Sequence, residues 1–167
     1  TFTRFRYMLD FSGFTRLDKF EIEDVEFQCS ELCSGLMLAP VGTVNVIRNC
    51  VFNRPADRCV TSIGEGCQGL LLDHNQFVSA EGGLATQNRS SVALNTNAND
   101  VKIRNNRASQ FRHFAVVSGA NGVIANNHFF QGDDSGNGTR SAGIVLCVKA
   151  TNTTISGNYV DNCFIEW

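Results

Sequence analysis

The stretch GVIANNHFFQG, residues 122–132, places two neighbouring asparagines between two apolar pairs. Asparagine side chains compete with the backbone for hydrogen bonds, so they favour caps and turns over helix interiors. The apolar residues on either side of the pair are therefore expected in two short strands. Asn126 and Asn127 would then form the bend between these strands, because asparagine tolerates left-handed backbone.

The pattern of this stretch recurs along the chain. An aliphatic residue is followed three positions later by a small or polar residue, and two positions further by an apolar one. The matching segments are FEIEDVEF, NVIRNCVF, LLLDHNQF, VKIRNNRA, GVIANNHF and TTISGNYV. Their aliphatic anchors, separated by 25, 25, 31, 21 and 31 residues, are Ile22, Ile47, Leu72, Ile103, Ile124 and Ile155. Such spacing indicates a stacked repeat with loops of variable length.

Each repeat also contains a second short apolar run, and no long helical periodicity is present. These runs are YMLDF, GLMLA, CVTSI, SVALN, FAVVS, GIVLC and CFIEW. One unit of this kind cannot bury its apolar face alone, whereas stacked units form a continuous core. The sequence therefore predicts an all-β fold in which strands of successive repeats pair in parallel, about 4.8 Å apart.

Two columns of the repeat carry this prediction. The residues three positions after the anchors are Val25, Cys50, Asn75, Asn106, Asn127 and Asn158. We expect the four asparagines to hydrogen-bond to one another as a ladder that ends at Cys50. Two positions further on lie Phe27, Phe52, Phe77, Ala108, Phe129 and Val160, which we expect to stack in the core.

This arrangement resembles the right-handed parallel β-helix of the pectin-lyase-like superfamily, from about Phe5 to Trp167. The resemblance implies a right-handed parallel β-helix of about six turns with a partial asparagine ladder. The superfamily includes polysaccharide lyases, polygalacturonase-like hydrolases, alginate epimerases, phage tailspikes and adhesins. A carbohydrate polymer is therefore the implied partner, and the implied location is extracellular, on a cell surface or on a phage virion.

The chain of 167 residues, 43% of them hydrophobic, suits a single β-helix domain over residues 1–167. Because it begins with Thr1 and stops on the strand-like segment FIEW, we expect it to be part of a longer chain. Both ends of the solenoid would then present unpaired strand edges that favour association.

Charge and composition argue against several partners. The net charge is −2 without a basic cluster, and no apolar stretch reaches the roughly 20 residues of a membrane span, so neither nucleic acid nor a membrane is expected. Seven cysteines are present, and Cys29 and Cys33 lie close in sequence but without a nearby histidine. We expect buried free thiols, no metal site and no cofactor.

The resemblance implies a catalytic site on the outer face of the second apolar run. We expect the inward residues there to be Leu36, Val60, Val92, Ala115, Ile144 and Phe164. The outward residues would be Met37, Thr61, Ala93, Val116, Val145 and Ile165, which carry no charge. This face lacks the carboxylates for calcium and the proton-abstracting base of the lyases. It predicts instead contact with another copy, or with a missing part of the chain, through Met37, Ala93, Val116, Val145 and Ile165.

Two polar columns flank the bend. The residues one position after the anchors, where acids and bases alternate, are Glu23, Arg48, Asp73, Arg104, Ala125 and Ser156. They are expected to form a solvated ladder of charge pairs.

Four positions after the anchors, Arg107, His128 and Tyr159 would lie on adjacent turns. They supply a cation, a base and an acid, the groups needed for β-elimination from a uronic acid.

A further catalytic candidate lies in the glycine-rich loop of residues 131–143. Asp133 and Asp134 there resemble the paired aspartates of polygalacturonase-like enzymes, although the other signatures of that family are absent. Three functions remain open on the sequence alone. They are a polysaccharide-interacting module for acidic polymers, a lyase or glycoside hydrolase fragment, and a purely structural β-helix segment.

Overall fold

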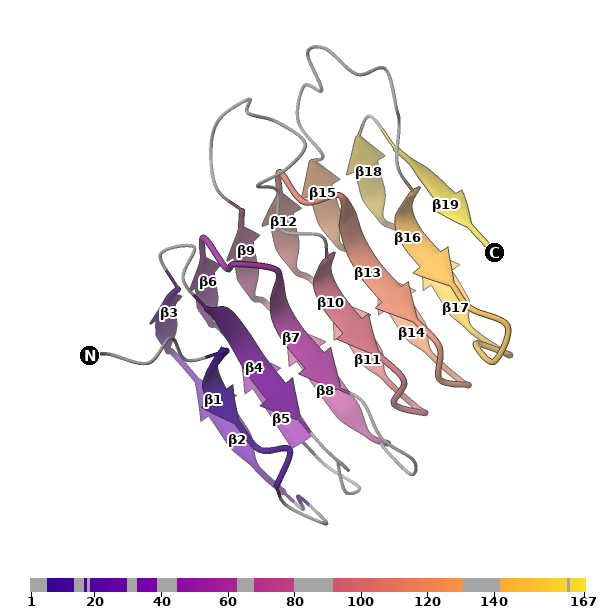
Figure 1. The fold of residues 1–167 in the computed structure, drawn as a ribbon. Helices are drawn as coiled ribbons and strands as arrows, with labels where there is room; N and C mark the ends of the chain where they lie inside the picture. Colours follow the sequence, from indigo (N-terminus) through magenta and orange to yellow (C-terminus); the bar gives the residue numbers. More distant parts are fainter. Residues whose placement is uncertain are drawn as a thin grey trace, which may run out of the picture.

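The computed structural model describes residues 6–13, 17, 19–29, 33–38, 45–62, 68–79, 92–130, 142–161 and 163–167, and of residues 92 and 142 only the backbone. Within these ranges the chain forms nineteen strands in three parallel sheets (Figure 1). The described residues include no helix that is long and apolar enough to cross a membrane.

Each turn of the chain contributes one strand to every sheet. Sheet 1 contains β1 (Tyr7–Asp10), β4 (Ser34–Leu38), β7 (Arg58–Ser62), β10 (Val92–Thr96), β13 (His113–Val117), β16 (Ala142–Leu146) and β19 (Phe164–Glu166). Sheet 2 contains β2 (Glu21–Glu23), β5 (Asn45–Arg48), β8 (Leu70–Asp73), β11 (Lys102–Arg104), β14 (Val123–Ala125) and β17 (Thr154–Ser156). Sheet 3 contains β3 (Glu26–Gln28), β6 (Val51–Asn53), β9 (Gln76–Val78), β12 (Arg107–Ser109), β15 (His128–Phe130) and β18 (Tyr159–Asp161).

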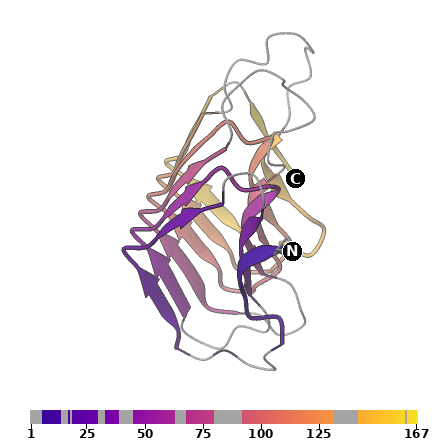
Figure 2. The same ribbon diagram turned by 60° about the vertical axis from the view of Figure 1, so that its left-hand side comes forward.

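The strands stack in sequence order within each sheet, so that the described chain makes six turns after β1. Figure 2 shows the successive turns lying one behind another around a common interior. The predicted all-β parallel β-helix of about six turns is confirmed.

Residues that share a predicted repeat column pair with one another in register along the sheets. The six aliphatic anchors pair directly with one another along sheet 2. The phenylalanine column pairs along sheet 3, and its members from Phe27 to Phe129 are buried. Phe27 stacks on Phe52 at a ring-centroid distance of 4.7 Å, and Phe52 stacks on Phe77 at 5.2 Å.

The bend between sheets 2 and 3 requires left-handed backbone in every turn. The residues at this position have φ between 54° and 63° and are Asp24, Asn49, His74, Asn105, Asn126 and Gly157. Asparagine, aspartate and glycine tolerate this conformation best, so they dominate the column. The role predicted for Asn126 is confirmed.

From the second turn onward, the next residue of the bend points into the core, whereas Val25 in the first turn is exposed. Nδ2 of Asn75 donates to Oδ1 of Asn106 at 3.0 Å, Asn106 donates likewise to Asn127 at 3.0 Å, and Asn127 donates to Asn158 at 2.9 Å. Each amide also donates to a backbone carbonyl of an earlier turn. The series ends where the backbone N–H of Cys50 donates to Oδ1 of Asn75 at 3.0 Å.

The core between sheets 1 and 3 pairs large residues with small ones. A Cβ added to Gly35 would lie 2.9 Å from the Phe52 ring, and one added to Gly143 would lie 3.0 Å from the Phe129 ring. Phe114 on β13 belongs to the same turn as Ala108 on β12. Phe114 is fully buried and stacks on Phe129 at 5.9 Å. Phe114 thus adds a large buried ring in the turn where the phenylalanine column holds the small Ala108.

The predicted register of sheet 1 was wrong at two strands. The inward row is Leu36, Val60, Leu94, Ala115, Ile144 and Ile165, so Leu94 and Ile165 stand where Val92 and Phe164 were expected. β10 begins two residues later than the alignment assumed, because Val92 pairs with Arg58 and His113, and Leu94 pairs with Val60. At β19 a β-bulge opposite Ala142 and Ile144 shifts the pairing by one residue.

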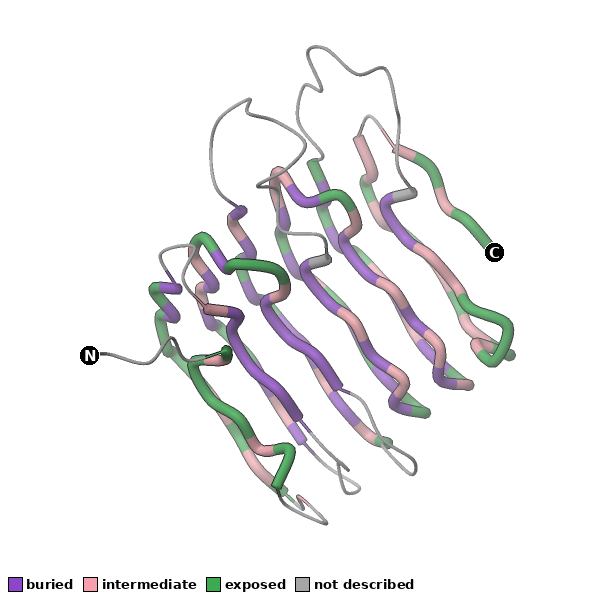
Figure 3. Tube along the Cα trace, in the orientation of Figure 1, coloured by how far each residue is buried: buried purple, intermediate pink, exposed green. Residues whose placement is uncertain are grey.

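This correction changes the apolar strip. The outward row contains Asn95 and the carboxylate Glu166 in place of Ala93 and Ile165, and Ala93 is fully buried. Met37 is also buried, at 7% exposure, as is the whole of β4 (Figure 3). Only the half-buried Val116 and Val145 remain of the predicted strip, which is too little apolar surface to argue for an interface.

Candidate functional site

The outer face of sheet 3 is built from two rows of side chains. Each strand has three residues, of which the middle one points inward and the flanking two point outward. The first outward row is Glu26, Val51, Gln76, Arg107, His128 and Tyr159. The second outward row is Gln28, Asn53, Val78, Ser109, Phe130 and Asp161.

The predicted trio lies together in the first row. Arg107 pairs in register with His128, and His128 pairs with Tyr159. The His128 and Tyr159 rings meet edge to face, with centroids 4.7 Å apart and planes at 84°. All three side chains are exposed. The exposed ring of Phe130 adds a further aromatic surface in the second row.

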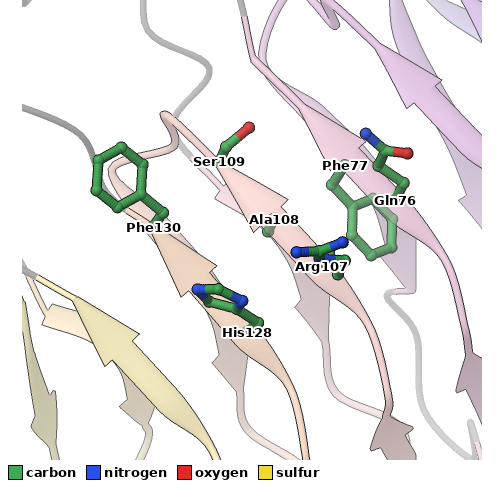
Figure 4. Close-up of a pocket in the computed structure, with 7 residues that line it drawn as sticks. All are labelled: Gln76, Phe77, Arg107, Ala108, Ser109, His128 and Phe130. Carbon is green, nitrogen blue, oxygen red and sulfur yellow. The ribbon is translucent and has the colours of Figure 1, made fainter.

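A depression of about 170 Å³ lies over β9, β12 and β15. Its lining residues are Gln76, Phe77, Arg107, Ala108, Ser109, His128 and Phe130. Figure 4 shows Arg107 beside His128 on adjacent strands, with Ser109 and Phe130 further along the same strands. The depression thus offers a cation, an imidazole, a hydroxyl and an aromatic ring to one ligand.

Arg107 differs from the arginines on the neighbouring sheet. Arg48 bridges Glu21 and Glu23 at 2.8 Å each, and Arg104 bonds Asp73 at 2.9 Å. Within the described ranges no carboxylate pairs with Arg107. Its guanidinium therefore keeps all five N–H donors available to an anion.

The charged column on sheet 2 has a structural role. The pairs Glu23–Arg48 and Asp73–Arg104 confirm the predicted alternation of acids and bases across turns. These contacts join successive turns and favour the observed register. They offer no unpaired carboxylate or guanidinium comparable to Arg107.

Sequence reasoning predicted the pairing of Asp73 with Arg104 but missed the contributions of Asn105 and His74 to the cluster around Asp73. This buried carboxylate accepts hydrogen bonds from Arg104 at 2.9 and 3.1 Å and from Asn105 at 2.9 Å, and its Oδ1 lies 2.8 Å from Nδ1 of His74. Burial raises the pKa of Asp73, but the bonds from Arg104 and Asn105 outweigh burial and hold it below the ordinary value. The available signal was the position of His74 in the bend column, where its backbone is left-handed.

Among the described residues the thiols form no disulfide: Cys29, Cys50 and Cys59 are buried, Cys33 and Cys163 are half-buried, and Cys147 is exposed. The predicted buried thiols are therefore confirmed only in part. Burial is the main cause that raises the pKa of Cys29 to about 12, with a smaller effect of the neighbouring Cys33. Such a thiol is a poor nucleophile, because the thiolate is the reactive form. No group of three or more metal-ligating side chains occurs within the described part of the chain.

The second catalytic candidate cannot be placed. Asp133 and Asp134 lie outside the described residues.

Comparison of the chain with family models, with curated proteins and with solved structures finds no match. Its function therefore has to be inferred from its own fold and surface.

Proposed function

We propose that the chain is a pectin-lyase-like β-helix module that binds an acidic carbohydrate polymer on the outer face of sheet 3. The observation that carries this proposal is Arg107, which lacks a carboxylate partner in the described ranges and lies in register with His128 and Tyr159. A cation beside two rings matches an anionic sugar better than it matches a neutral or apolar ligand.

Each group of this face has a corresponding feature on an acidic sugar. The planar guanidinium of Arg107 suits bidentate binding of a carboxylate. The exposed rings of Tyr159 and Phe130 can pack on the apolar faces of sugar rings. Gln76 and Ser109 supply hydrogen-bond donors and acceptors for hydroxyl groups. The resemblance to a superfamily that acts on carbohydrate polymers supports the same class of ligand.

Binding of acidic and neutral polysaccharides, measured by isothermal titration calorimetry, tests the proposal. We expect Arg107→Gln to weaken binding of acidic polymers roughly tenfold to a hundredfold, the range for loss of a charge-assisted hydrogen bond. Lys102→Gln is the matched control, because Lys102 is an exposed cation on β11 of the same turn but faces outward from sheet 2. It should bind as the wild type does. Equal binding by the Arg107→Gln variant and the wild type would contradict the proposal.

Polysaccharide lyase activity is a second candidate, favoured by the edge-to-face contact of His128 and Tyr159 next to Arg107. In this reaction Arg107 would neutralise the uronate carboxylate, and His128 would take the proton from the adjacent carbon. The electron pair of that C–H bond would form the carbon–carbon double bond as the glycosidic C–O bond breaks. Tyr159 would give its proton to the leaving oxygen.

The lyase candidate predicts unsaturated uronate products, which are detected by their ultraviolet absorbance. His128→Ala and Tyr159→Phe should each abolish product formation, while Lys102→Gln should not. Turnover that persists in His128→Ala would eliminate this mechanism. An absence of both binding and turnover on every polymer would leave the structural β-helix segment as the remaining function.

A further inference from the structure

The two outward rows of sheet 3 change in chemical character along the solenoid. Around β12 and β15 the first row presents Arg107 and His128. At β18 the two outward residues are Tyr159 and the carboxylate Asp161, which pairs in register with Phe130 on β15. The face is thus cationic toward β12, and it combines aromatic and acidic groups toward β18.

The face has more room across the strands than along them. Each strand presents only two outward residues, spaced about 7 Å apart along the strand. From β9 to β18 the first row crosses four strands at about 4.8 Å each, so it extends over roughly 15 Å. A linear polymer therefore contacts the most groups when it crosses the strands, with about one sugar unit per strand spacing, so that each unit lies between two neighbouring strands.

The acidic group at β18 restricts what such a polymer can carry there. Within the described ranges Asp161 forms no ion pair, so its charge is not offset by a neighbouring cation. Arg107 lies two strand spacings away, roughly 10 Å, where solvent and salt already screen much of its field. A ligand carboxylate over β18 would meet Asp161 without compensation, whereas a neutral sugar ring would pack on Tyr159 and Phe130.

We infer that the ligand is a mixed polymer, in which an acidic sugar over Arg107 and His128 is followed by a neutral sugar over Tyr159 and Phe130. This inference rests on the proposed function and names its substrate class. A polymer that carries a carboxylate on every unit fits the β12–β15 part of the face but not the β18 part.

Size-matched oligosaccharides of three kinds test the inference by calorimetry. They are oligogalacturonate with a carboxylate on every unit, hyaluronan oligomers in which acidic and neutral sugars alternate, and neutral dextran oligomers. We expect the wild type to bind the alternating oligomer roughly twofold to fivefold more tightly than the fully acidic one, as for an exposed charge pair. Dextran oligomers should bind most weakly.

Asp161→Asn should reduce the difference in affinity between the alternating and the fully acidic oligomers, because it strengthens binding of the fully acidic one. Asp100→Asn is the matched control, because Asp100 is an exposed aspartate at the bend before β11 whose left-handed backbone asparagine also tolerates. Asp100→Asn should leave the ratio of the affinities for the two acidic oligomers unchanged.

The outcomes separate this inference from the proposed function. If both acidic oligomers bind, Arg107→Gln weakens both, and Asp161→Asn leaves their ratio unchanged, the inference fails while the proposed function stands. Tighter wild-type binding of the fully acidic oligomer also overturns the inference alone. If neither acidic oligomer binds, both fail.

Discussion

At the scale of single residues, the two asparagines of GVIANNHFFQG separate into two roles. Asn126 adopts the left-handed backbone of the bend, with φ of 56°. Asn127 turns inward, where Oδ1 accepts from the backbone N–H and from Nδ2 of Asn106, and Nδ2 donates to Asn158 and to the Ile103 carbonyl. A buried amide with four partners is stabilising only while all four remain.

Asn127→Ala should therefore lower the free energy of unfolding by about 3 kcal/mol, because it leaves several buried groups without partners at about 1 to 3 kcal/mol each. The measurement is urea denaturation monitored by circular dichroism. Asn158→Ala is the comparison, since Asn158 is only half-buried and water can replace its bonds. Its loss should be smaller, about 1 kcal/mol. Equal small losses in both variants would show that the amide series contributes little.

The lowered pKa of Asp73 predicts that the stability of the fold depends on pH. Its pKa in the folded state is lowered, because the bonds from Arg104 and Asn105 outweigh the opposing effect of burial. The stability it contributes is therefore complete above the ordinary aspartate range near pH 4 and is lost as the pH falls through the lower folded-state pKa. The free-energy difference between wild type and Asp73→Asn should shrink on acidification below about pH 4.

The control for this titration is Asp100→Asn, whose exposed carboxylate forms no ion pair in the described ranges. Denaturation of the three proteins at a series of pH values gives the comparison. A difference between wild type and Asp73→Asn that stays constant from neutral to acid pH would contradict the assigned direction of the pKa shift.

At the scale of elements, sheets 2 and 3 could be predicted from the sequence and sheet 1 only in part. The bend between sheets 2 and 3 has a constant length, so anchors such as Ile103 and Ile124 fix the register of both neighbouring strands. The sheet 1 strands follow loops of variable length, and a β-bulge intervenes at β19. Short apolar runs such as SVALN fit more than one register, so only the folded structure distinguishes Val92 from Leu94 as the inward partner of Val60.

The candidate site could likewise be predicted from the sequence only in part. Arg107, His128 and Tyr159 share a column of the constant bend, so their proximity followed from spacing alone. The cluster at Asp73 depends on side-chain directions at a left-handed corner, which spacing does not reveal.

Ala108 on β12 and Phe114 on β13 are a small and a large core residue of the same turn, and we expect substitutions at the two positions to be energetically coupled. Phe114→Ala should cost about 3 to 5 kcal/mol, because it opens a cavity in the core beside Phe129, in the turn that holds the small Ala108. Ala108→Phe alone should cost about 1 to 3 kcal/mol through overpacking. The double variant restores one large and one small residue. Its loss of unfolding free energy should therefore be smaller than the sum of the two single losses by about 0.5 to 3 kcal/mol. Urea denaturation of the four proteins completes the cycle, and single effects that simply add would show that the two positions do not share one space.

At the scale of the whole molecule, the described strands bond only to strands of the preceding and following turns. Sheets built in this way have no long-range pairing that joins distant turns directly. Stability is then approximately a sum over turns and over the interfaces between neighbours. Local damage should consequently remain local, unlike in a domain whose core unites all elements.

Ile103→Ala tests this expectation, because Ile103 is fully buried and pairs with Leu72 and Ile124 on the adjacent turns. Its cavity should cost about 2 to 5 kcal/mol. Hydrogen exchange followed by mass spectrometry should then show faster exchange in β8, β11 and β14, with β2 and β3 little changed. Ile22→Ala, in the half-buried first turn, is the reciprocal control and should affect β2 and β5 instead. If hydrogen exchange became faster to the same extent in all turns of either variant, the six turns would open as one cooperative unit. The free energy of the interfaces between neighbouring turns would then exceed the intrinsic stability of a single turn.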